Sequence, residues 1–121
     1  MKESEKTKLV NHVVDDIYQA YPGLIDKFGE NGRRRTVEDN HHHLDHLDTA
    51  YQMGSSTFFV DYTLWLNSVL TSRGVGTELI VDNYERLIKC MEEAVFESSD
   101  ERDAYLEYLQ AGMEELKTLP K

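Results

Sequence analysis

Apolar residues recur with a helical period along most of the chain, and this pattern predicts the elements. In the first run they share one helix face: Leu9, Val10, Val13, Val14, Ile17 and Tyr18. The run ends at Tyr21-Pro22-Gly23, because a residue that precedes proline disfavours the helical conformation. One or two further turns are expected over 24–28, closed by Gly29 and Gly32.

A second long helix is predicted from Thr36 to about Met53. The Thr36 side chain is placed to accept a hydrogen bond from the backbone of Asp39, and the acidic residue suits the positive end of a helix. Gly54 is expected to end this helix, since glycine readily adopts the left-handed conformation found there.

Two further helices are predicted in the middle of the chain. The third follows a cap at Ser55 or Ser56, and its apolar residues cover more than half its circumference, so we expect it to be central and the most buried: Phe58, Phe59, Val60, Tyr62, Leu64, Trp65, Leu66, Val69 and Leu70. Gly74 and Gly76 separate it from the fourth, which starts at Thr77. The apolar stripe of the fourth helix is Leu79, Ile80, Tyr84, Leu87, Ile88, Met91 and Val95.

The last helix is expected after a capping box that runs from Ser98 to Glu101. Its apolar residues are Tyr105, Leu106, Leu109, Met113 and Leu116. No alternating apolar and polar run indicates a strand, and connections of about two to five residues favour antiparallel neighbours. We therefore expect an all-α fold, with residues 1–121 forming one domain, a compact bundle of five to six helices, and a linker from Lys117.

Composition and charge narrow the classes of function. The net charge is −10, from 23 acidic and 13 basic residues, which disfavours binding to nucleic acid. No apolar stretch approaches the roughly 18 residues of a membrane span. The charged start lacks a signal sequence, and Cys90 is the only cysteine, so we expect a cytoplasmic chain whose thiol stays reduced and packs.

The basic run Arg33-Arg34-Arg35 is a candidate anion or partner site. Three adjacent guanidinium groups can hold a phosphate or an acidic partner. The alternative is a solvated loop whose charges offset nearby acidic residues.

Four histidines fall between His41 and His46, on the second predicted helix. At about 100° per residue, the apolar arc of this helix is defined by Val37, Leu44, Leu47 and Tyr51. This arc places His41 at its edge, toward a neighbouring helix, and His42, His43 and His46 on the polar side with Asp39.

The polar side of the histidine helix is a candidate metal site. His42 and His46 are separated by one helical turn, a spacing that chelates divalent metals, and Asp39 adds an oxygen ligand one turn earlier. A zinc site needs further ligands with an ordered second layer of partners, and the alternative is a plain polar face.

A ligand pocket between the second and third helices is the other candidate site. It would use His41 from one helix and Asp61, Tyr62 and Trp65 from the other. Asp61 stands among apolar residues, where a carboxylate must be paired or have a raised pKa, and a structural ion pair is the alternative. Neither His41 nor Asp61 has a nucleophile beside it, so we expect no enzyme activity.

Several short motifs resemble the photoglobins, non-haem globin domains of bacterial signalling proteins that are associated with cobalamin-binding domains. The resemblance covers about residues 18–90 and rests on Tyr21-Pro22, Phe28-Gly29-x-x-Gly32-Arg33, Glu38-Asp39, His42-His43-Leu44-x-x-Leu47, Phe59-x-x-Tyr62-x-x-Trp65 and Arg73-Gly74. It implies a globin-like sensory or interaction domain without catalysis. The cobalamin signature Asp-x-His-x-x-Gly is absent, so this chain should not bind cobalamin unaided. No histidine follows His46 to act as a conventional proximal haem ligand, which leaves haem ligation by His41.

Three functions are therefore expected, in decreasing order. The first is a non-enzymatic sensory or regulatory domain that acts through a partner protein or as a homodimer. The second is a metal- or haem-binding protein that uses the His41–His46 helix. The third is an acidic inhibitor that occupies a basic surface of another protein.

Overall fold

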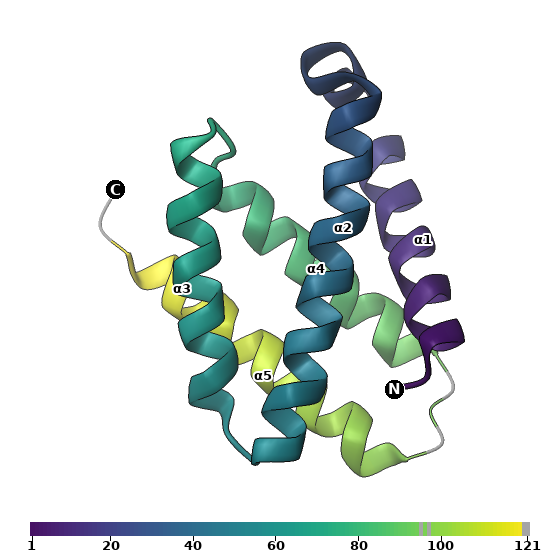
Figure 1. Ribbon diagram of the computed structural model, residues 1–121, viewed down its shortest axis with the longest axis vertical. Helices are drawn as coiled ribbons and strands as arrows, with labels where there is room; N and C mark the ends of the chain where they lie inside the picture. Colours follow the sequence, from purple (N-terminus) through teal and green to yellow (C-terminus); the bar gives the residue numbers. More distant parts are fainter. Residues whose placement is uncertain (95, 97, 120–121) are drawn as a thin grey trace.

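The computed structural model describes residues 1–94, 96 and 98–119, and these residues form helices and no strand. The helices are α1 (Glu3–Ala20), α2 (Gly23–Met53), α3 (Ser56–Ser72), α4 (Thr77–Glu93) and α5 (Ser99–Thr118) (Figure 1). The predicted all-α class and the bundle of five helices are confirmed.

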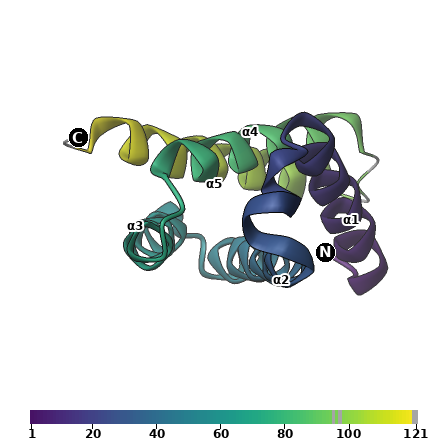
Figure 2. The same ribbon diagram turned by 90° about the horizontal axis from the view of Figure 1, so that it is seen from above.

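The helices form two layers. α1, α2 and α3 run alternately up and down beside one another, while α4 and α5 cross behind α2 and α3 (Figures 1 and 2). Buried side chains from every helix join in a single hydrophobic cluster between the layers. In the part of the chain that is described, no helix combines the length and apolar character that crossing a membrane requires.

Three of the predicted helix ends are confirmed by their capping contacts. The Ser55 hydroxyl oxygen accepts from the Phe58 backbone N–H at 3.3 Å, and the Ser98 oxygen accepts from Glu101 N–H at 3.2 Å. Gly54 ends α2 with φ 63°, the left-handed conformation that satisfies the last carbonyl groups.

The predicted start of the second long helix at Thr36 is wrong. α2 begins at Gly23 and continues to Met53, with one break at Gly29, whose φ of 68° and ψ of −168° are accessible essentially only to glycine. Gly32 stays helical, so the chain does not need a new cap. The Thr36 hydroxyl instead donates to the Gly32 carbonyl one turn earlier, at 2.9 Å.

The third helix is not the most buried one. Only Phe59, Tyr62, Thr63 and Leu66 of α3 are buried, and Trp65 is 61% exposed. The reason is that α2, α4 and α5 pack against only part of the circumference of α3, and the remaining side is exposed within the described residues. The apolar residues of this outer side therefore remain partly in solvent.

The predicted ends of the fourth and fifth helices need separate comment. Val95, expected on the stripe of the fourth helix, is not among the described residues. α5 extends to Thr118, so the first two residues of the linker expected from Lys117 are helical, and residues 120–121 lie outside the description.

A glycine allows α5 to approach α3 and α4 closely. A Cβ atom on Gly112 would lie 2.9 Å from Thr63 Oγ1 and 3.2 Å from a ring carbon of Tyr84. The Thr63 hydroxyl cannot move away easily, because it is hydrogen-bonded at 2.9 Å to the Phe59 carbonyl and at 2.9 Å to the Tyr84 hydroxyl. The close packing of α5 against α3 and α4 therefore depends on the absence of a side chain at Gly112.

We predict that Gly112→Ala destabilises the fold by about 1–3 kcal/mol, because the added methyl group overpacks this contact. A loss of stability would be informative, because the helix propensity of alanine by itself would stabilise the variant by about 1 kcal/mol relative to glycine. Gly23→Ala is the matched control, because a Cβ at Gly23 meets nothing within 4 Å. Urea denaturation of the two variants checks this. Equal stability of both would contradict the close contact.

Candidate functional site

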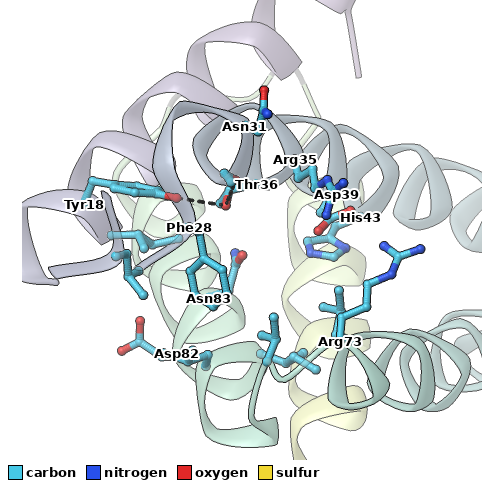
Figure 3. A pocket seen from close by; sticks show the side chains of 17 residues that line it. Tyr18, Phe28, Asn31, Arg35, Thr36, Asp39, His43, Arg73, Asp82 and Asn83 are labelled. Atoms are coloured by element: carbon cyan, nitrogen blue, oxygen red, sulfur yellow. Dashed lines mark hydrogen bonds between the residues drawn. The ribbon is translucent and has the colours of Figure 1, made fainter. Parts of the chain in front are cut away.

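A cavity of about 370 Å³ lies between the first half of α2, the end of α1 and the turn from α3 to α4 (Figure 3). Much of its wall is apolar and comes from four helices: Ile17, Leu24, Phe28, Leu70, Leu79 and Ile80. Because the size and the apolar wall are typical of pockets for small molecules, this cavity is the candidate functional site.

The break at Gly29 helps to enclose the cavity. It turns the first segment of α2, residues 23–28, out of line with the rest of the helix. Leu24 and Phe28 of that segment form part of the cavity wall. A straight helix would carry these side chains elsewhere, so the glycine break closes this side of the site.

Polar residues at four-residue spacing form one side of the cavity. Asn31, Arg35, Asp39 and His43 all line it from α2, and we call them the α2 polar stripe. The spacing places them on one face of the helix, one turn apart. Arg73, the C-cap of α3, lies across from the stripe (Figure 3).

Three charged groups of this site, Arg35, Asp39 and Arg73, lack close partners among the described residues. Neither Arg35 nor Arg73 makes a hydrogen bond or an ion pair there, and the same holds for Asp39. Burial raises the pKa of the Asp39 carboxyl, an effect only partly offset by the nearby positive charges of His42, Arg73 and Arg35. The cavity therefore holds separate charges that a ligand can approach.

His43 is buried, so its predicted position on the polar side is wrong. It is only 2% exposed and lies against Tyr62 and Tyr84, with its Nδ1 atom 2.6 Å from the Tyr62 hydroxyl. Burial, with a smaller contribution from His42 and His46, lowers the pKa of the His43 ring to about 3. His43 is therefore neutral at pH 7.

The error comes from the rotation of α2. Its buried residues are Asn40, His43, Leu44, Leu47 and Ala50. The centre of this set lies roughly 50° from the arc expected from the large apolar residues alone. Tyr51, which helped to define the expected arc, is 38% exposed, while the small Ala50 is fully buried.

The tautomer of His43 follows from its partner. Burial raises the pKa of the Tyr62 hydroxyl, so the phenol keeps its single proton, and His43 is its only hydrogen-bond partner among the described residues. Tyr62 therefore donates to Nδ1, and the ring proton resides on Nε2. Nε2 has no partner there and no buried side-chain nitrogen or oxygen is unsatisfied, so this N–H is accessible to the cavity that His43 lines.

None of the four residues of the predicted pocket, His41, Asp61, Tyr62 and Trp65, lines the cavity. Tyr62 lies behind His43, His41 is only partly buried, and Trp65 is largely exposed. Asp61 is exposed to solvent, so the apolar surroundings expected for its carboxylate are not formed. Asp61 lies on the exposed side of α3.

The three predicted metal ligands lie in different surroundings on α2. His42 is exposed, Asp39 lines the cavity, and the His46 ring stacks on Tyr62 at 3.8 Å between centroids. His46 Nδ1–H also donates to the His42 carbonyl at 2.7 Å. Within the described ranges, no three His, Cys, Asp or Glu side chains are grouped to hold a metal.

The three consecutive arginines diverge instead of forming one anion site. They lie in α2 and not in a loop, and successive helical residues are turned by about 100°. Arg33 pairs with Asp15 of α1, and Arg34 donates to Asn31 at 2.6 Å. Only Arg35 reaches the cavity.

Sequence reasoning missed Arg73 and Asn83 as residues of the site. Asn83 of α4 exchanges two hydrogen bonds with the fully buried Asn40, at 2.8 and 3.0 Å, which holds α4 against α2. The one signal in the sequence was the four-residue spacing of the α2 polar stripe. Nothing local indicated that Arg73, at the end of another helix, would face it.

Comparison of the chain with protein-family models, with curated proteins and with solved structures found no match. The candidate site is therefore inferred from the geometry and chemistry of the chain itself.

We predict that His43 makes the stability depend on pH between 7 and 5. Below pH 6.5 the unfolded histidine binds a proton that the folded one, with a pKa of about 3, does not. The free energy of unfolding then falls as the pH is lowered, by at most about 1.4 kcal/mol per pH unit. In His43→Gln this dependence should be lost, as measured by urea denaturation at several pH values.

The pH dependence due to Asp39 must be distinguished from that due to His43. The raised pKa of Asp39 acts in the opposite direction, because the folded carboxyl binds a proton more readily than the unfolded one. Asp39→Asn removes that contribution and should leave the His43 dependence steeper or unchanged. Identical pH profiles for the original chain and His43→Gln would show that His43 is not held neutral.

Proposed function

We propose that this chain is a non-enzymatic sensory or regulatory domain that binds a small, largely apolar molecule in the cavity. The observation that carries the proposal is the cavity itself, about 370 Å³ with an apolar wall and a few polar groups that converge at one side. This volume falls in the range of roughly 300–1,000 Å³ for small-molecule sites. The resemblance to the photoglobins remains a prediction and agrees with a sensory role.

Two residues support a role without catalysis. A general base works best with a pKa near the working pH, and the pKa of His43 is about 3. Burial raises the pKa of the Cys90 thiol to about 11, so it is protonated and a poor nucleophile. Neither of these groups is prepared for chemistry at neutral pH.

α3 offers a route from the cavity to a partner. Leu70 and Arg73 near its end line the cavity, while Trp65, one to two turns earlier, is 61% exposed. Exposed tryptophan is enriched at protein interfaces. We propose that ligand binding at the end of α3 changes how its outer side meets a partner protein or a second copy of the chain.

A cavity-filling variant tests ligand binding. We predict that octanamide, a neutral probe, raises the melting temperature of the original chain in a saturable manner. Leu79→Trp should abolish this shift, because Leu79 lines the cavity and the larger ring occupies it. Leu64→Trp is the control, since Leu64 is half-buried on α3 but not part of the wall.

Differential scanning fluorimetry gives the readout for all three proteins. The proposal fails if neither octanamide nor the matching acid, octanoate, stabilises the original chain. It also fails if Leu79→Trp responds to the probe as strongly as the Leu64→Trp control does.

A second prediction concerns Trp65. Because this side chain is mostly exposed, Trp65→Ser should change the stability of the monomer by no more than about 0.5 kcal/mol. The same change should weaken self-association, or binding to a partner, measured by sedimentation over a range of concentrations. Association that is unchanged in Trp65→Ser would argue against the outer side of α3 as the output surface.

A further inference from the structure

The cavity has a polar end and an apolar end. Arg35, Asp39, His43 and Arg73 lie together at one end, and Phe28 lies at the other, toward α1 (Figure 3). A molecule that fits this arrangement has a polar head and an apolar body. The identity of the head follows from the charges and donors at the polar end.

The charges at the polar end favour an anion. Two guanidinium groups, Arg35 and Arg73, face a single carboxylate, Asp39, so one positive charge is in excess. Asp82, on the opposite rim, pairs with Arg86 at 2.8 Å, and Arg86 also pairs with Asp16 at 2.8 Å, so the negative charge of Asp82 lies away from the polar end. A singly charged anion balances the excess, whereas a dianion would place unpaired negative charge beside Asp39.

The third donor is the Nε2–H of His43. The His43 side chain is only 2% exposed. Its Nδ1 atom already accepts a hydrogen bond from the Tyr62 hydroxyl. The Nε2–H makes no hydrogen bond within the described residues and is accessible from the cavity, so a ligand oxygen can accept from it. Two guanidinium groups and one neutral N–H together form a donor set that suits the two oxygens of a carboxylate.

The volume sets the size of the ligand. The cavity of about 370 Å³ equals about a dozen water molecules at roughly 30 Å³ each. A methylene group occupies a similar space, so the ligand has about a dozen non-hydrogen atoms. An acid with a hydrocarbon chain of about eight carbons, or with one aromatic ring, meets this limit.

We propose that the ligand is an apolar monocarboxylate of about this size, whose carboxylate is bound by Arg35, Arg73 and the Nε2–H of His43. Its hydrocarbon body extends along the apolar wall toward Leu24 and Phe28. The proposal rests on the proposed function, because it assigns a chemical class to the ligand of the same cavity.

The test compares matched head groups by isothermal titration calorimetry at pH 7.5. Octanoate and octanamide share one chain and differ in the charge of the head. We expect octanoate to bind about 10- to 100-fold more tightly, as hydrogen bonds to a charged group contribute more than neutral ones. Octyl phosphate, a dianion near this pH, should bind more weakly than octanoate.

Neighbouring arginines provide a matched pair of variants. Arg35→Gln should weaken octanoate binding about tenfold or more and leave octanamide binding unchanged. Arg34→Gln removes the same charge one position earlier, outside the cavity, and should change neither. Asp39→Asn should strengthen octanoate binding, because it removes the one negative charge at the polar end.

The outcomes separate the two proposals. Equal affinity for octanoate and octanamide overturns the carboxylate assignment and leaves the ligand-binding function standing. Tighter binding of octyl phosphate overturns the choice of a monoanion. An equal loss in Arg34→Gln and Arg35→Gln shows that only the overall charge matters, which also overturns the assignment. No saturable binding of either octanoate or octanamide contradicts both proposals.

Discussion

The hydrogen bond from the Tyr62 hydroxyl to His43 Nδ1 determines how the rest of the site is arranged. It joins α3 to α2 in the core, at 2.6 Å, and it fixes the rotation of α2 about its axis. A helix turned to bury His43 also presents Arg35 and Asp39 to the cavity, since they precede it by two turns and one turn, respectively. The amide pair of Asn40 and Asn83 holds the same rotation against α4.

Polar groups in the core therefore specify the geometry that apolar packing alone would leave free. Leucine and valine side chains can pack in several rotations, whereas each buried hydrogen bond is satisfied in only one. Every buried side-chain nitrogen and oxygen in the described part of the chain has a partner. The break at Gly29 then adds the last wall, by turning residues 23–28 across the side of the cavity.

Local sequence signals predicted several helix ends correctly. The rotation of α2 and the burial of α3 depend on tertiary packing, which these signals do not show. Ser55, Ser98 and Gly54 act through their own backbone neighbours, so their roles were visible in the sequence. The rotation of α2 was misjudged because the small Ala50 is buried and the large Tyr51 is not. The burial of α3 was overestimated for the same kind of reason, since its sequence does not show which side other helices cover.

The central claim is that His43 is a neutral donor that faces a ligand cavity, and nuclear magnetic resonance of ¹⁵N-labelled histidine tests it most directly. At pH 7 the account predicts a neutral His43 ring with its proton on Nε2, and a downfield shift of that proton when octanoate is added. A charged ring, or a neutral ring protonated on Nδ1, would contradict the arrangement around Tyr62. Unchanged His43 signals at octanoate saturation would contradict the site.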